Sequence, residues 1–141
     1  MAVINVVMPI RAPSETVWEI VSDLDAEPKF WKGTKSIRNI SKDGDRVHRE
    51  ITIAFRDQKC IQDVTLYPPN RIDAQFVKGI IKGNKEIVVA GDEQATTLSV
   101  TWNIELSGMM KMFTKMIAGH IENGTRQALS SIKHEAEGNT E

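Results

Sequence analysis

One histidine stands where it could take part in proton transfer. His120 follows Phe113, Met116 and Ile117 at helical spacing, so its imidazole is expected on the same side as these apolar residues. Because an imidazole titrates near neutral pH, His120 could donate or accept a proton, or hydrogen-bond a ligand's hydroxyl or carbonyl group. A core or boundary histidine bonded to a strand side chain fits the same spacing. His120 is therefore a candidate catalytic residue, and the catalytic residues are otherwise unknown.

Polar residues on the expected strands are weaker candidates. His48 and Glu50 are two residues apart and therefore share one strand face, where they could form a polar pair or simply face solvent. Asp63, Asn103 and Glu105 allow the same two interpretations. No catalytic set can be assigned from their order along the chain.

The residues expected to contact a ligand are mostly aromatic or contain sulfur. Four of the six methionines lie between positions 109 and 116, and their flexible, polarizable side chains suit ligands of varied shape. A methionine stripe at helical spacing is also typical of a packed core. The expected ligand-binding residues are Trp31, Phe55, Phe76, Trp102, Met109, Met112, Phe113, Met116 and His120.

The sequence has no spacing typical of a metal or cofactor site. Its three histidines are far apart, and Cys60 is the only cysteine, so neither a disulfide nor a cysteine cage is expected. The glycines Gly79, Gly83 and Gly91 fall at strand turns rather than at the strand-to-helix junction that a phosphate cradle needs. We therefore expect no metal and no cofactor.

The composition is that of one globular domain. The 141 residues are 40% apolar and 26% charged, with 18 basic and 19 acidic side chains and a formal charge of −1. Without a basic block, nucleic acid is not an expected partner. The chain has no apolar run of roughly 20 residues and begins without signal-peptide features, so we expect a cytoplasmic protein with no integral membrane segment. We expect a monomer or a weak homodimer.

Alternation and turn residues predict an antiparallel sheet and one long helix. A strand over 2–10 leads through Pro13 into a helix of about three turns, and the aromatic segment 25–32 forms a short helical turn. Between 45 and 56 the odd-numbered positions are mostly apolar but include Arg49, so the inward face is ambiguous. Further strands are expected over 34–41, 45–56, 58–67, 71–78, 82–90 and 96–106, and the helix runs from about 109 to 136.

The predicted order is therefore β-α-α-β-β-β-β-β-β-α. The amphipathic helix must cover one face of the sheet, which gives an α+β domain over 1–136 and a frayed polar tail at 137–141. A twisted sheet curls, and a straight helix across its concave side cannot fill all the space beneath it. We therefore expect a cavity between sheet and helix.

Three stretches resemble the START-like, or SRPBCC, superfamily. Residues 10–18 followed by Asp23 are similar to its strand-to-helix transition, and Phe30-Trp31 stands where its members commonly place a tryptophan after a proline. Residues 121–133 are similar to its closing helix, in which a glycine precedes a leucine and a lysine. The resemblance covers nearly the whole chain and implies a helix-grip fold, in which a curved antiparallel sheet wraps around a long C-terminal helix beside an internal cavity.

The superfamily includes polyketide cyclases and dehydrases, coenzyme Q-binding proteins and pollen-allergen ligand carriers, so the resemblance implies architecture more directly than activity. Our primary hypothesis is the binding or transport of a small hydrophobic molecule, such as a lipid, isoprenoid, quinone or polyketide-like compound, without catalysis. The alternative is a cyclase or dehydratase that moves protons in the same cavity through His120 or a strand carboxylate. A third alternative is a protein-interaction module with a filled core, for which the cavity would measure less than about 150 Å³.

Overall fold

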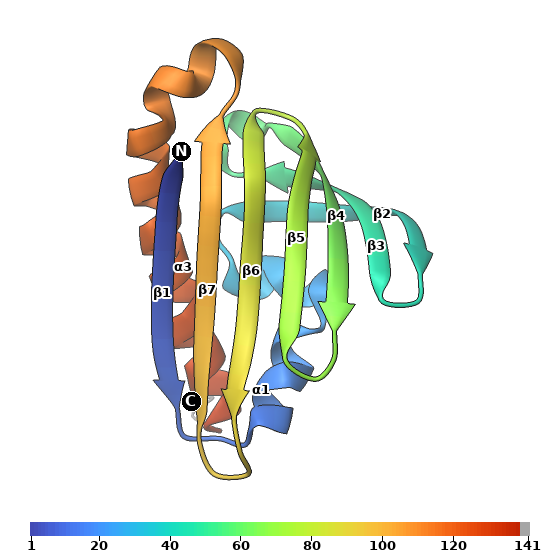
Figure 1. Cartoon of the computed structure of the whole chain (residues 1–141), viewed down its shortest axis with the longest axis vertical. Helices are drawn as coiled ribbons and strands as arrows, with labels where there is room; N and C mark the ends of the chain where they lie inside the picture. Colours follow the sequence, from blue (N-terminus) through green and yellow to red (C-terminus); the bar gives the residue numbers. More distant parts are fainter. Residues whose placement is uncertain (139–141) are drawn as a thin grey trace.

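Residues 1–138, which the computed structural model of the chain describes, form a seven-stranded antiparallel sheet and a long C-terminal helix (Figure 1). The strands lie in the order β1-β7-β6-β5-β4-β3-β2. The elements in chain order, with η for a 3-10 helix, are β1 (Ala2–Ile10), α1 (Ser14–Val21), η1 (Leu24–Ala26), α2 (Glu27–Phe30), β2 (Thr34–Asp43), β3 (Arg46–Ile53), η2 (Phe55–Asp57), β4 (Lys59–Tyr67), β5 (Arg71–Lys78), β6 (Ile81–Gly91), β7 (Thr96–Leu106), η3 (Gly108–Phe113) and α3 (Thr114–Ala136).

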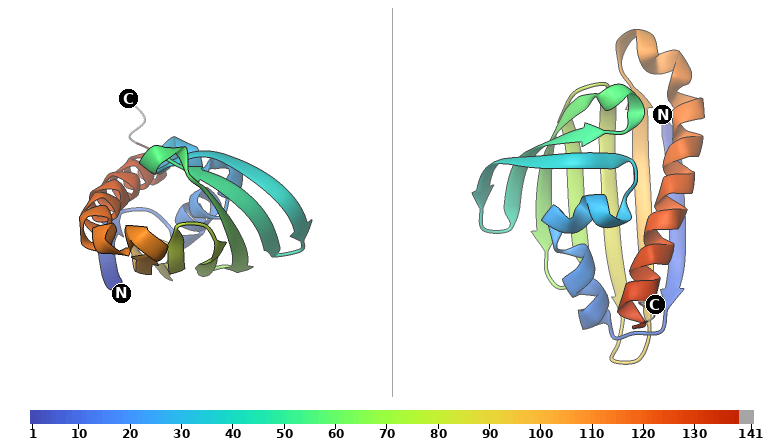
Figure 2. Two further views of the ribbon diagram at one scale, coloured as in Figure 1. Left: turned by 90° about the horizontal axis from the view of Figure 1, so that it is seen from above. Right: turned by 180° about the vertical axis from the view of Figure 1, so that it is seen from behind.

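The three α-helices lie on the inner side of the curled sheet. Helix α3 packs against β1 and β7, and α1 packs against α3, β6 and β7. The sheet curves from its β1 edge toward β2, which contacts α2 (Figure 2). The predicted α+β helix-grip architecture, with a curved antiparallel sheet and a long C-terminal helix, is confirmed.

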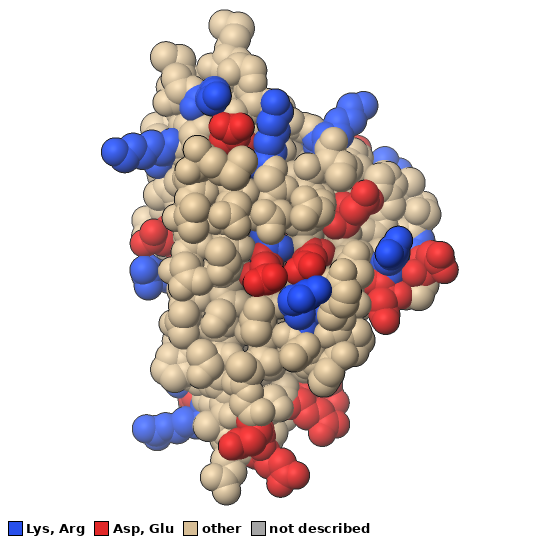
Figure 3. All heavy atoms as spheres, in the orientation of Figure 1, with Lys and Arg blue, Asp and Glu red and all other residues tan. Residues whose placement is uncertain are grey.

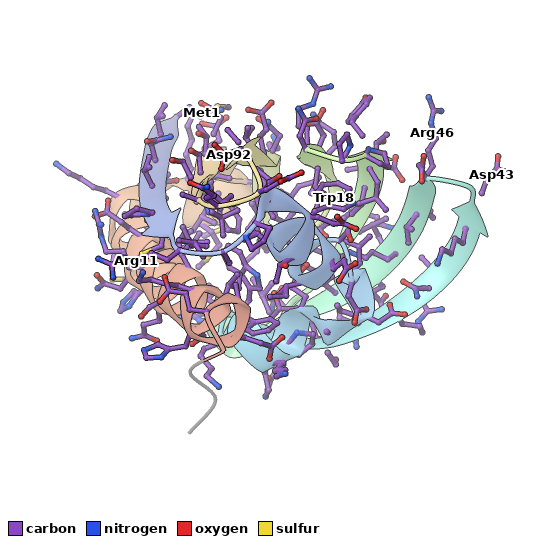
Figure 4. The ribbon with its side chains drawn as sticks, turned by 90° about the horizontal axis from the view of Figure 1, so that it is seen from below. Met1, Arg11, Trp18, Asp43, Arg46 and Asp92 are labelled. Carbon is purple, nitrogen blue, oxygen red and sulfur yellow. The ribbon has the colours of Figure 1, made fainter. Side chains whose placement is uncertain are left out.

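Helix α1 fills one end of the space between α3 and the sheet. It begins after Pro13, and the Ser14 N–H donates a hydrogen bond of 2.9 Å to the Asp92 carbonyl, which ties the helix start to the β6–β7 turn. Val17 is completely buried, and Trp18 packs against the core. Figure 4, viewed from this end, shows α1, marked by Trp18, beside α3 with side chains filling the space around it.

Strand β3 ends earlier than the sequence predicts. The pattern predicts a strand to Arg56, but β3 ends at Ile53 and a single 3-10 turn, η2, follows. Arg56 and Asp57 have φ angles of 54° and 53°, in the left-handed region that strands do not use. The turn places Phe55 beside the mouth of the cavity described below.

The C-terminal helix begins later than the sequence predicts. Residues Gly108–Phe113 form the 3-10 helix η3, and α3 starts at Thr114. The Thr114 hydroxyl accepts a hydrogen bond of 3.0 Å from the Leu106 N–H and donates one of 2.7 Å to the Lys111 carbonyl, which fastens the junction to the end of β7. Because a 3-10 helix has 3.0 residues per turn rather than 3.6, positions before Thr114 fall out of phase with α3.

The end of α3 is attached to the strand-to-helix connection near Arg11. The Glu137 carboxylate accepts hydrogen bonds of 2.8 Å from the Arg11 N–H and 2.5 Å from Lys133 Nζ. Figure 4 marks Arg11 at this end of the molecule. The predicted frayed tail, 137–141, lies mostly outside the described residues, and its first residue is held by these two bonds.

The outer face of the sheet carries charges of both signs (Figure 3). On this face, basic side chains gather toward the end that holds η3, and acidic side chains gather toward the opposite end. Arg71 and Asp73 form an ion pair of 3.5 Å between neighbouring side chains of β5. Within residues 1–138, none of the helices has both the length and the apolar character needed to cross a membrane.

Candidate ligand-binding site

A cavity of about 620 Å³ lies between the sheet and the first half of α3. Ligand pockets typically measure about 300–1,000 Å³, so this volume suits a small molecule. Exposed residues at its rim, including Lys32, Gly33, Ala54 and Asn123, open it toward solvent. The wall consists of Glu27, Trp31, Lys32, Gly33, Thr34, Ile51, Ile53, Ala54, Phe55, Gln62, Phe76, Ile81, Lys85, Trp102, Ile117, His120, Ile121, Asn123, Gly124, Thr125 and Gln127.

Three aromatic rings form one connected part of the wall. The centroids of Trp31 and Trp102 are 6.3 Å apart with their planes at 65°, and Phe76 stacks on Trp102 at 6.3 Å and 23°. Trp102 Nε1–H donates a hydrogen bond of 3.1 Å to the Thr125 hydroxyl, which donates in turn to the Ile121 carbonyl at 2.7 Å. These contacts fix the Trp102 ring between sheet and helix and leave its surface available to an apolar ligand.

Small side chains on α3 keep the space open. Gly124 lines the cavity, and a Cβ built at this position meets no atom within 4 Å. Ile121 and Ile117 lie one and two helical turns earlier and add apolar surface. The hollow therefore exists partly because residue 124 has no side chain to fill it.

A buried ion pair closes the inner end of the cavity. Arg49, only 2% exposed, donates from Nη2 to Glu27 Oε1 at 2.7 Å and from Nε to Gln62 Oε1 at 3.0 Å. Glu27 Oε2 accepts a hydrogen bond of 3.0 Å from the Thr34 hydroxyl. Burial raises the pKa of Glu27, but the charges of Lys85 and Arg49 and these hydrogen bonds outweigh it, so the pKa lies below the ordinary 4.5. Glu27 is therefore ionised at neutral pH.

Lys85 extends from β6 into this end of the cavity and is 5% exposed. Its Nζ lies 3.3 Å from the centroid of the Trp31 ring and 4.8 Å from that of Trp102, which are cation–π contacts. Burial lowers the pKa of Lys85 from 10.5 to about 8; the charge of Glu27 opposes this shift, and that of Arg49 adds to it. The ammonium group is thus protonated at neutral pH and can act as a proton donor or as a partner for an anion.

Three residues of the cavity wall separate it from a second, smaller cavity: Glu27, Trp31 and Lys85. All three line both the large cavity and a second cavity of about 30 Å³ beneath α1. That smaller volume has room for about one water molecule. The charged residues thus separate the hollow part of the interior from the packed part below it.

Five of the nine residues predicted to bind a ligand lie in the cavity wall. They are Trp31, Phe55, Phe76, Trp102 and His120. His120 is exposed at the rim, and within residues 1–138 no side chain makes a hydrogen bond with its ring. The roles of all five in binding or catalysis stay predictions.

The other four predicted residues do not face the cavity, which corrects the sequence-based placement. Met109, Met112, Phe113 and Met116 are 91%, 79%, 38% and 53% exposed, and none of them lines the hollow. The prediction assumed one continuous α-helix from residue 109. The 3-10 segment η3 breaks that phase and turns Met109 and Met112 toward solvent, whereas Met116 lies on the exposed side of α3 itself.

The weaker strand candidates also lie outside the cavity wall. His48 Nδ1 and Asp63 Oδ1 are 2.5 Å apart on the paired strands β3 and β4, on exposed side chains. Glu50 pairs with Arg38, and Glu105 lies 3.8 Å from Lys111. Asn103, like these residues, is absent from the wall.

The charged part of the cavity was missed, although two signals in the sequence point to it. Lys85 alternates with the apolar residues Ile87 and Val89, so strand periodicity would place it on the inner face. Arg49 stands among the mostly apolar odd-numbered positions of 45–56, but the sequence does not indicate its partner. Glu27 lies on α2 and pairs with Arg49 across 22 residues, so spacing within one element could not reveal the pair.

Within the described residues, no group of three or more His, Cys, Asp or Glu side chains could hold a metal ion.

Comparison with solved structures shows the same fold in proteins of low sequence identity. The Zhui aromatase/cyclase from Streptomyces sp. R1128 superimposes with a TM-score of 0.84 at 15% identity, covering 96% of this chain and 93% of that one. A protein from Thermus thermophilus gives a TM-score of 0.83 at 14% identity, with coverage of 99% and 100%. A START superfamily protein from Mycobacterium smegmatis gives 0.73 at 19% identity, with coverage of 94% and 97%.

Comparison with curated protein sequences gives no match. The family model described as "Polyketide cyclase / dehydrase and lipid transport" matches residues 1–137. This match spans almost the whole chain, and the solved structures, one of them a START superfamily protein, show the same fold. The chain therefore belongs to the polyketide cyclase/dehydrase and lipid transport family.

Proposed function

We propose that the protein binds or transports a small, largely apolar molecule in the cavity between the sheet and α3. The observation that carries this proposal is the cavity of about 620 Å³, whose wall includes Trp31, Phe76 and Trp102. Burial of apolar ligand surface contributes about 25 cal/mol per Å² before the ordering costs of binding. A filled core, which the interaction-module alternative requires, is inconsistent with a hollow of this size.

Two glycines of α3 provide a matched test. Gly124 lines the cavity, whereas Gly119 is exposed outside its wall, and a Cβ at either position meets no atom within 4 Å. Replacing either glycine by leucine improves helix propensity by roughly 0.5–1 kcal/mol, so both variants should fold. Only the leucine of Gly124→Leu places its side chain in the ligand volume.

The measurement is the fluorescence of N-phenyl-1-naphthylamine, a neutral apolar probe. We expect wild type and Gly119→Leu to bind the probe equally, and Gly124→Leu to bind it about tenfold more weakly or worse, because the leucine occupies its site. Quenching of tryptophan emission should follow the same order, since Trp31 and Trp102 lie in the wall. Undiminished binding by a folded Gly124→Leu variant would place the probe elsewhere and reject the proposal.

A second candidate is a cyclase or dehydratase that uses the same cavity. The observation that favours it is that two side chains of the kinds used as general acids and bases, Lys85 and His120, line one hollow. Mass spectrometry of compounds extracted from the purified protein, before and after incubation, tests this candidate. A product lighter by one water, formed by wild type but not by a His120→Ala variant that still binds the naphthylamine probe, would identify an enzyme rather than a carrier.

A further inference from the structure

The charges of the side chains at the inner end of the cavity do not sum to zero. Glu27 provides one negative charge, and Arg49 and Lys85 provide two positive charges. Both oxygens of Glu27 are already engaged, Oε1 by Arg49 at 2.7 Å and Oε2 by Thr34 at 3.0 Å. Arg49 forms the direct ion pair with Glu27, Lys85 acts on Glu27 through its charge without a hydrogen bond, and the three groups together carry one positive charge in excess.

The ammonium group of Lys85 has no hydrogen-bond acceptor in the described part of the chain. It carries three donors, yet its close contacts are the faces of Trp31 and Trp102. A buried cation is costly unless it is paired and hydrogen-bonded, and two aromatic faces provide only part of that compensation. Because Lys85 is more than nine-tenths buried and lines the cavity, the missing acceptor can be supplied from the ligand space.

We infer that the ligand carries one acidic oxygen group, a carboxylate or an ionised phenol, which pairs with Lys85 Nζ while its apolar body lies against the aromatic wall. This inference rests on the proposed function, and it narrows the class of ligand from apolar molecules in general to amphipathic acids. A ligand with no acceptor would leave the three donors of Lys85 unsatisfied, and a neutral hydroxyl or carbonyl group would accept a hydrogen bond without compensating the charge. A doubly charged ligand would find no second buried cation free, since Arg49 is already paired with Glu27.

Ionisation of Lys85 gives the inference a pH signature. The charged groups that face it are Glu27 from α2 and Arg49 from β3, and the further titratable groups of the cavity wall, Lys32 and His120, are exposed at the rim. The pKa of Lys85 is about 8 in the unliganded protein, and a bound anion raises it. Preference for an acidic ligand should therefore be greatest below pH 8 and decline as the pH rises beyond that value.

The test compares decanoate with 1-decanol, which share a chain length and differ in the headgroup. Both are measured by displacement of N-phenyl-1-naphthylamine from wild type, Lys85→Met and the control Lys82→Met. We expect wild type to prefer decanoate by about tenfold or more, the value of a charge-assisted hydrogen bond in a buried site. Lys85→Met should lose this preference and keep its affinity for decanol, whereas Lys82→Met, which changes an exposed residue of the same strand outside the cavity wall, should alter neither by more than about threefold.

The possible outcomes separate this inference from the proposed function. If the probe and decanol bind but wild type shows no preference for decanoate, the acidic ligand is rejected and the apolar carrier stands. If neither the probe nor decanol binds, the carrier itself fails. A preference retained by Lys85→Met would also reject the assignment to Lys85. Should Lys85→Met not fold, the acid-to-alcohol preference of wild type and its decline above pH 8 decide the matter without a variant.

Discussion

The two halves of α3 cover the same sheet with different results. In the C-terminal half, Ala128, Leu129 and Ile132 are almost completely buried. In the N-terminal half, Ile121 and Gly124 border a hollow of about 620 Å³. The difference is explained by α1, which packs against α3, β6 and β7 beside the C-terminal half of α3. Helix α1 does not extend to the N-terminal half (Figure 2). A helix across a curled sheet leaves space, and the space survives only where no third element fills it.

Substitutions where the packed and the hollow parts of the interior meet should lower the free energy of unfolding most. Arg49 is buried there and balances the charge of Glu27. Arg49→Met should lower the free energy of unfolding by about 3–5 kcal/mol, because it leaves a buried carboxylate without its partner. Urea denaturation measures this cost, with Arg38→Met as the control, since the exposed Arg38–Glu50 pair should contribute less than about 1 kcal/mol. Adding Glu27→Gln to Arg49→Met should recover part of the loss. Equal costs for the two arginine variants would mean that the ion pair does not support the boundary.

A pair of truncations on α3 tests the contrast between its halves directly. Leu129 is completely buried at the packed end, and Ile121 is partly buried beside the cavity. Leu129→Ala should cost about 3–4 kcal/mol of unfolding free energy because it creates a new void. Ile121→Ala enlarges a void that already exists and should cost roughly 1 kcal/mol, the transfer energy of its partly exposed atoms. Both values come from denaturant titration, and similar costs would show that the two halves are packed alike.

The elements of the fold could be predicted because they depend on local patterns. Alternation predicted β7 with the bounds 96–106 that the structure shows, and the flanking turn residues predicted β5 over about 71–78, which also agrees with the structure. The start of the last helix was wrong because the tight turns of η3 depend on Thr114 bonding to Leu106 and Lys111, a contact that apolar spacing does not encode. Exposure of Met109 and Met112 follows from that shift in phase, whereas Met116 is exposed because it lies on the solvent side of α3.

The cavity could be predicted as a consequence of the fold, but its chemistry could not. Aromatic residues such as Trp31 and Trp102 were identified by type. The charged end depends on side chains from α2, β3 and β6 that meet only after the sheet has curled. Single-element periodicity can place Lys85 on an inner face, but it cannot show that Glu27 is already paired with Arg49. That pairing leaves Lys85 as the unbalanced charge.

The pH dependence of stability tests whether Lys85 is buried where the packed and hollow parts of the interior meet. Burial lowers the pKa of Lys85 to about 8 in the folded protein, below the ordinary 10.5 that applies to the unfolded chain. Below the lower value both states are protonated and the cost of burying the charge is fully present. Between the two values the unfolded chain keeps a proton that the folded protein has released, so the contribution of Lys85 to stability rises with pH.

The free energy of unfolding of wild type relative to Lys85→Met should therefore increase by roughly 2 kcal/mol between about pH 8 and about pH 10. Burial raises the pKa of the Cys60 thiol and acts in the opposite direction, but this effect is common to both proteins and cancels in their difference. Urea titrations of the two proteins across this range give the value. A difference that stays constant would mean that Lys85 is solvated in the folded state, which would remove both the partition between the packed and hollow halves and the reason for an acidic ligand.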